Sequence, residues 1–130
     1  MNVKRILVIA DRKDSSQKAL AHAALMAKQF NASIHVAGFC YERLSVLDES
    51  MSKSDIDTAK QKIVQASQAW LDETVSESSL PVSTTDEMVW SKDIAAWVNK
   101  HCSTHQYDLI IKTGHRSEHA FYVPTDWQLL

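Results

Sequence analysis

A chain of 130 residues and 14.7 kDa fits one domain, and its 45% hydrophobic and 23% charged residues are typical of a globular protein. The formal net charge of −2 argues against a nucleic-acid-binding surface, which usually carries a basic excess. Two cysteines without motif spacing, and no apolar run long enough for a signal peptide or a membrane span, favour a cytoplasmic protein without nucleic-acid or membrane partners.

The first third of the chain is predicted to form a strand, a helix and a second strand. Val3–Ala10 is an almost continuous aliphatic run, typical of a strand buried on both faces of a parallel sheet. Asp14 or Ser15 can cap the following helix, and Asn31 can end it in the left-handed conformation. The second strand covers Ile34–Cys40. The apolar stripe of the helix contains Ala19, Ala23, Ala27 and Phe30.

The middle third begins with a polar connection over Tyr41–Lys53, and long connections in compact domains are often functional. A long helix is predicted from about Asp55 to about Glu77, because apolar residues recur there at alternating spacings of three and four. Pro81 then breaks the chain before a third strand over Val82–Val89.

The last third is predicted to form a helix, a short strand and the start of a further helix. Ser91 or Asp93 can cap the first of these helices. Leu109–Lys112 is the fourth strand, and Pro124 suits the first turn of a helix that the chain cuts short at Leu130. One side of the capped helix carries Ile94, Trp97, Val98, His101 and Cys102.

Strand and helix therefore alternate four times along one domain, residues 1–130. This alternation predicts an α/β fold with an open parallel sheet, right-handed crossovers and helices on both faces. The periodicity alone does not determine the order of the strands.

At four places the sequence resembles the universal stress protein family. Ile6-Leu-Val-Ile-Ala-Asp11 looks like that family's first strand with its terminal acidic residue. Asn31-Ala32 and Tyr107-Asp-Leu-Ile-Ile fit the family pattern before the second strand and at the fourth strand. Pro124-Thr-Asp-Trp-Gln-Leu-Leu130 is similar to the first domain of the tandem, E-type members.

The resemblance implies a Rossmann-like sheet of five strands in the order 3-2-1-4-5. The chain ends before the fifth strand, so we expect a truncated domain in which strand four has an open edge. Native proteins seldom leave such an edge uncovered. The expected partner is therefore a second copy, in a homodimer, or a second universal stress protein domain.

The resemblance also places a ligand crevice where strands one and four end, at the point where the strand order reverses. In the nucleotide-binding branch of the family, glycines after strand four hold phosphate. Aligned through that strand, the glycine positions fall on Thr113, Arg116 and Asp126, and Gly114 is one place out of register. We therefore expect no cofactor and a degenerate site, with ATP or AMP as the alternative. The residues expected around the crevice are Asp11, Phe39, Thr113, Gly114, His115 and Arg116.

Two of these residues have alternative interpretations. Asp11 either contacts the ribose or base of a ligand or accepts hydrogen bonds from the N–H groups of its own loop. Arg116 either binds a phosphate or carboxylate in bidentate fashion or pairs with Asp126 and fills the empty site. We favour the second interpretation for Arg116.

The histidine pattern favours packing over a metal site, and a metal-binding domain that uses His115 and His119 is the weaker, third hypothesis. His115 and His119 have four-residue spacing, which suits a metal only if that segment is helical. His101 and His105 share this spacing but are expected to pack on their helix. His35, inside strand two, is expected to be a buried, hydrogen-bonded imidazole.

No nucleophile stands at motif spacing from a base, and no Walker loop or dinucleotide fingerprint is present, so we expect no enzyme. The sequence predicts a non-enzymatic stress-response domain that acts through dimerisation or partner contacts. The alternative is a sensor that binds a nucleotide or another anion in the crevice of Asp11 and Arg116.

Overall fold

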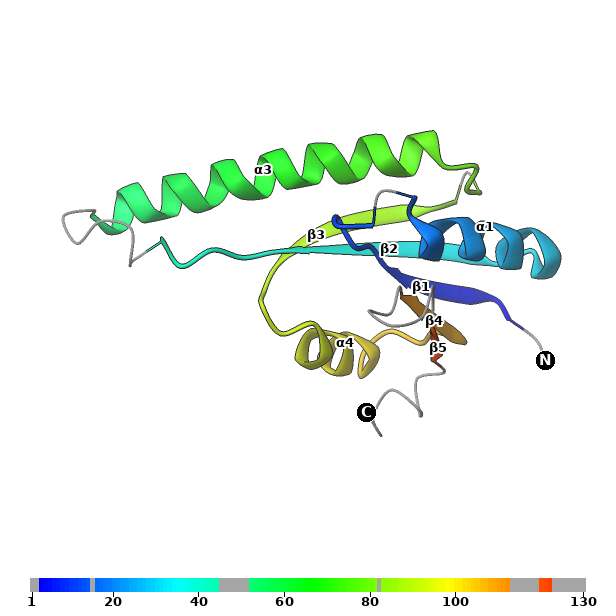
Figure 1. The fold of residues 1–130 in the computed structure, drawn as a ribbon. Coiled ribbons are helices and arrows are strands. Elements are labelled where there is room, and N and C mark those ends of the chain that lie inside the picture. The colour runs from blue at the N-terminus through cyan, green and yellow to red at the C-terminus, as the bar shows by residue number, and fades with distance from the viewer. Residues whose placement is uncertain (1–2, 15, 45–51, 82, 113–119, 123–130) are drawn as a thin grey trace.

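The computed structural model describes residues 3–14, 16–44, 52–81, 83–112 and 120–122. Three α-helices and five β-strands follow one another along this part of the chain (Figure 1). Their bounds are β1 Arg5–Ile9, α1 Lys18–Phe30, β2 Ser33–Cys40, α3 Lys53–Glu77, β3 Thr85–Trp90, α4 Ile94–Cys102, β4 Leu109–Lys112 and β5 Ala120–Tyr122.

The strands form one sheet in the order β3-β2-β1-β4-β5. The first four are parallel, and Ile6 of β1 pairs with Ile34 of β2 on one side and Leu109 of β4 on the other. Helices α1 and α3 cover one face of the sheet and α4 covers the other (Figure 1). The predicted α/β class, the order of the first four strands and the helices on both faces are confirmed.

The aliphatic run of β1 is buried on both faces of the sheet, as predicted. Ile6 and Val8 belong to the core beneath α1 and α3, whereas Leu7 and Ile9 belong to the core beneath α4. Each of the four side chains is at most 4% exposed. Successive residues of a strand point to opposite faces, so only a continuous apolar run can fill two cores.

Helix α1 ends as predicted and begins later than predicted. Asn31 adopts a left-handed conformation with φ 55°, and its N–H donates to the carbonyl of Ala27. The residue before the helix is Gln17, also left-handed, so the predicted cap at Asp14 or Ser15 is wrong in position. The Asp14 carboxylate nevertheless accepts a hydrogen bond from the N–H of Lys18, at 2.9 Å.

The long helix α3 begins at Lys53 because Ser52 and Asp55 form a capping box. Ser52 Oγ accepts from the Asp55 N–H at 3.1 Å, and the Asp55 carboxylate accepts from the Ser52 N–H. In the described part of the chain, no helix has both the length and the apolar composition needed to cross a bilayer.

The segment between α3 and α4 differs in detail from the prediction. The Thr84 N–H donates to the carbonyl of Pro81 at 3.0 Å, and this turn delays the start of β3 to Thr85. Before α4, Asp93 is the cap, with its carboxylate 3.0 Å from the Ala96 nitrogen. Ser91 instead accepts a hydrogen bond from the Asp93 N–H.

The edge of the sheet beside β4 is where the prediction was wrong. We expected strand four to have an open edge, but β5 pairs with it in antiparallel fashion, with Ile110 opposite Tyr122. A three-residue strand leaves no periodicity to detect in the sequence. The helix predicted from Pro124 lies outside the described residues.

Candidate functional site

A cavity of about 280 Å³ opens at the carboxyl ends of the central strands. It lies at the end of β1, where the strand order reverses, because β2 pairs with one side of β1 and β4 with the other. Ligands of open α/β sheets usually bind at this point. The expected crevice therefore exists. Its lining residues are Ile9, Ala10, Asp11, Arg12, Lys13, Phe39, Ile94 and Lys112.

Asp11 lies at the end of β1 with its carboxylate turned to its own loop. Its Oδ1 accepts a hydrogen bond from the backbone N–H of Lys13 at 2.9 Å, and the side chain of Gln17 donates to the Asp11 carbonyl at 2.7 Å. Of the two interpretations offered by the sequence, the one with loop hydrogen bonds is observed. A ligand contact by Asp11 stays a prediction.

Phe39 forms the β2 wall of the cavity. Its ring meets the ring of Trp97, on α4, edge to face, with centroids 5.3 Å apart and an interplanar angle of 81°. Such a contact holds the Phe39 ring in one orientation. The structure thus brings Asp11 and Phe39 into one cavity, as expected from the sequence.

The remaining predicted site residues, Thr113, Gly114, His115 and Arg116, lie outside the described residues. The same holds for His119 and Asp126, so neither the pairing of Arg116 nor a metal site at His115 is tested. Lys112, the last residue of β4, lines the cavity, and the predicted site residues from Thr113 onward follow it directly in the sequence.

Basic side chains outnumber acidic ones in the cavity lining, which contains three basic residues, Arg12, Lys13 and Lys112, and one acidic residue, Asp11. Arg12 is held toward α3: its Nη1 donates to Ser67 Oγ at 3.3 Å, and its guanidinium lies 5.3 Å from the Trp70 ring centroid. Arg12 and Lys13 were not predicted from the sequence as site residues. Their position directly after the strand-end acid was the available signal.

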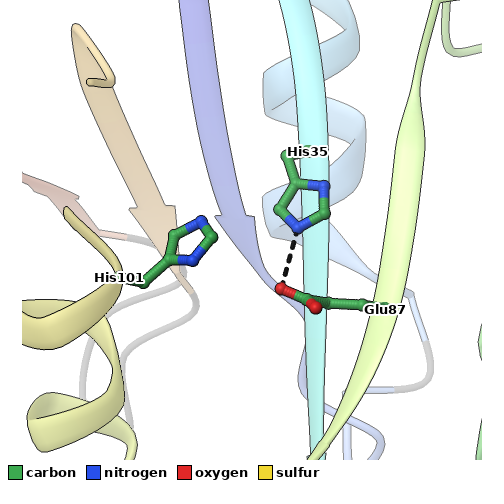
Figure 2. Close-up of side chains that lie close together, drawn as sticks. All are labelled: His35, Glu87 and His101. Atoms are coloured by element: carbon green, nitrogen blue, oxygen red, sulfur yellow. Dashed lines mark hydrogen bonds and ion pairs between the residues drawn. The ribbon is translucent and has the colours of Figure 1, made fainter. Parts of the chain in front are cut away.

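A second cluster of functional groups lies on the α4 face of the sheet. His35, Glu87 and His101 each offer one donor atom within 4.8 Å of the others (Figure 2). His35 is hydrogen-bonded as predicted, but its side chain is 19% exposed rather than fully buried. Burial lowers the pKa of His101, and the nearby His105 lowers it further. These residues are separated by 52 and 14 positions along the chain, so no sequence spacing signals the cluster.

Comparison with known proteins supports the fold and the family. Residues 2–121 match the model of the Universal stress protein family. A search of curated proteins finds no match. Universal stress protein UspA from Lactobacillus plantarum has a similar structure, with 18% identity, a TM-score of 0.61 and coverage of 99% of this chain and 92% of that chain.

A protein of the universal stress protein family from Burkholderia pseudomallei is also similar in structure, with 17% identity and a TM-score of 0.55. The similarity covers 87% of this chain and 83% of that chain. At such low identity, the two structures show that the fold is shared and nothing about ligands.

Proposed function

Because the chain belongs to the universal stress protein family, we propose that it serves the stress response as a non-enzymatic domain acting through assembly. In this proposal the crevice at the strand ends does not bind ATP in the usual way of the family. The chain acts in the cytoplasm, paired with a second copy or with a second universal stress protein domain.

The observation that carries this proposal is that the crevice is small and that its strand-end carboxylate is already hydrogen-bonded to its own loop. The Asp11 carboxylate is bonded to the N–H of Lys13, and the cavity is about 280 Å³, just below the range of about 300–1,000 Å³ usual for small-molecule sites. Close approach of backbone to phosphate requires glycine, and Gly114 is the one glycine after β4. The sequence after β4 therefore offers a triphosphate a single glycine at which the backbone could approach it closely.

Assembly is supported by the edge of the sheet and by the sequence that follows it. Among the described strands, β3 and β5 lie at the two edges of the open sheet, and an edge strand presents unpaired backbone groups to which a further strand can add. The segment Pro124–Leu130, which resembles E-type tandem proteins, follows β5 in the sequence. We propose on this ground that the chain is related to the first domain of such a tandem protein.

Two measurements on the purified chain test the proposal. Calorimetric titration with ATP and Mg²⁺, and separately with AMP, should give no saturable heat. Sedimentation velocity over a hundredfold range of protein concentration should show a monomer converting into a dimer. ATP binding tighter than about 100 μM, equivalent to about −5.5 kcal/mol, would overturn the lost-site part of the proposal. A monomer at every concentration would overturn the homodimer.

A second candidate function is favoured by the basic lining of the crevice. Arg12, Lys13 and Lys112 could hold an anion smaller than ATP, and the chain would then be a sensor of a nucleotide or another anion. Lys13→Gln should weaken binding of inorganic phosphate or AMP in that case. The matched control is Lys100→Gln on α4, which lies outside the cavity lining and should leave binding unchanged.

A further inference from the structure

Three side chains with metal-binding chemistry meet on the α4 face, away from the crevice. His35 lies on β2, Glu87 on β3 and His101 in the last turn of α4 (Figure 2). The sheet register sets Glu87 beside Ala37, so His35 and Glu87 are diagonal neighbours on one face. Phe39, in the crevice wall, is four residues further along β2, or about 13 Å. The cluster is therefore separate from the proposed ligand crevice.

The contacts of His35 turn one ring nitrogen toward Glu87. Nδ1 lies 2.6 Å from Thr85 Oγ1, and Nε2 lies 3.0 Å from Glu87 Oε1. A proton or a cation must lie between Nε2 and Oε1, because a bare imidazole nitrogen and a carboxylate oxygen both present lone pairs. A metal ion that replaces this proton satisfies the same two atoms. The Thr85 hydroxyl then serves as the outer hydrogen-bond partner that metal-bound histidines usually have.

The ring of His101 is held by its neighbours with one nitrogen available. Its Nε2 lies 2.9 Å from Tyr107 Oη. The ring stacks on Trp97 and on His105, with centroid distances of 4.4 and 4.1 Å. Since Nε2 is engaged by Tyr107, Nδ1 is the nitrogen that can take a metal ion.

The donor set selects the kind of ion. Two imidazole nitrogens and one carboxylate oxygen suit zinc and its transition-metal neighbours, whereas Mg²⁺ and Ca²⁺ prefer sites made of oxygen. All three residues are partly exposed, which leaves a fourth position for water, as in open zinc sites.

The three ligand atoms must move slightly closer together to bind one zinc ion. Zinc bonds of about 2.0–2.1 Å set tetrahedral ligand atoms about 3.3 Å apart. His35 and Glu87 are already at 3.0 Å, and the widest separation in the cluster, at most 4.8 Å, must shrink by about 1.5 Å. Rotation of a partly exposed side chain covers such a distance without moving the backbone.

We propose that His35, Glu87 and His101 bind a divalent cation of the zinc class, with water as the fourth ligand. The positive charge of Arg5 lies nearby and opposes the binding of a cation, since its guanidinium is 4.9 Å from the centroid of the Tyr107 ring. When the ion binds Nε2 of a neutral His35, the ring proton moves from Nε2 to Nδ1 and is donated to Thr85 Oγ1, so no net proton is released. This inference is independent of the proposed function of the crevice.

The test is a calorimetric titration of zinc chloride into the full chain after treatment with a chelator. We expect saturable binding of one ion per chain. His35→Gln, Glu87→Gln and His101→Gln should each weaken binding at least about tenfold, since loss of an outer partner alone typically costs 10–100-fold. The matched control is His22→Gln on α1, at the opposite face, which should bind zinc like the unmodified chain.

Two outcomes of this titration would overturn the proposal: no saturable heat, or unchanged affinity in all three variants, which would point to His115 and His119. A measurement on the unmodified chain covers the case in which a variant fails to fold. In nitrogen-15 spectra of the histidine rings, zinc should shift the resonances of His35 and His101 and leave His22 in place. Shifts confined to other histidines would also overturn the proposal.

Discussion

Asp86, on β3, lies close to Asp72, on α3, and the two carboxyl groups can share a hydrogen bond only while one of them carries a proton. Burial, followed by the hydrogen bond and the negative charge of Asp72, raises the pKa of Asp86 from its ordinary value of 3.8 to about 6. The His35 side chain acts in the opposite direction. The contact between α3 and β3 therefore contains a carboxyl group that titrates near neutral pH.

This pair predicts that the chain loses stability as the pH rises from about 4 to about 6. In that window the folded state holds a proton on Asp86 that the unfolded chain releases, so folding is favoured on the acid side. Asp86→Asn keeps a hydrogen-bond donor to Asp72 and removes the charge. We expect it to stabilise the fold at pH 7.5 by about 1 kcal/mol, a value reduced from the full shift because the group is partly exposed.

Urea unfolding between pH 4 and pH 8, on chelator-treated protein, measures this effect. The stability of the unmodified chain should fall across the window, and that of Asp86→Asn should fall less. Asp57→Asn, at an exposed position of α3, is the matched control and should follow the unmodified chain. Identical curves for Asp86→Asn and the unmodified chain would contradict the assignment of the proton to this pair.

A second prediction concerns Asp108, which joins the start of β4 to the start of β1. One oxygen of its carboxylate, Oδ2, accepts hydrogen bonds from the N–H groups of Lys4 and Arg5, at 2.8 and 3.0 Å. Asp108→Ala removes both bonds and should lower the free energy of unfolding by about 1–2 kcal/mol. Asp108→Asn keeps one acceptor oxygen and should lose less. Equal unfolding midpoints for Asp108→Ala and the unmodified chain would show that water replaces these bonds at no cost.

A third prediction concerns Gly38, where β2 passes beneath α3. A Cβ at this position would lie 2.8 Å from the Cε of Met88 and 3.3 Å from the Cδ2 of Leu71. Gly38→Val should therefore destabilise the fold by about 1–3 kcal/mol through overpacking. Met88→Ala in the same chain should recover part of the loss because it removes the clashing methyl group. Thermal unfolding of the single and double variants measures both effects, and additive losses would refute the packing explanation.

The fold was largely predictable because each central strand satisfies a simple physical condition. A run such as Ile6–Ala10 can be buried on both sides only in a parallel sheet covered by helices. Asn31 ends α1 because asparagine tolerates the left-handed conformation. The start of α1 at Lys18 and the strand β5 were not predictable. The first depends on a left-handed Gln17, and the second is three residues long and gains its stability from pairing with β4.

The two candidate sites also differ in how far the sequence alone could predict them. Asp11 and Phe39 were assigned to one crevice because parallel strands end at the same edge of a sheet. The cluster of His35 and Glu87 with His101 depends on the register of β2 against β3 and on the position of the last turn of α4. Neither of these follows from spacing along the chain.

The final prediction follows from the outer contact of the proposed metal site. Thr85→Val keeps the shape and strand preference of the side chain and removes the hydroxyl that lies 2.6 Å from His35 Nδ1. Zinc affinity should fall about 10–100-fold, because the imidazole loses the partner that fixes its orientation, while stability changes by less than about 0.5 kcal/mol at this exposed position. Thr84→Val is the matched control. Its hydroxyl oxygen is buried without a hydrogen-bond partner among the described residues, so the change should leave zinc affinity unaltered and stabilise the fold. Equal zinc affinity in Thr85→Val and Thr84→Val, measured by the same titration, would mean that His35 does not ligate through Nε2.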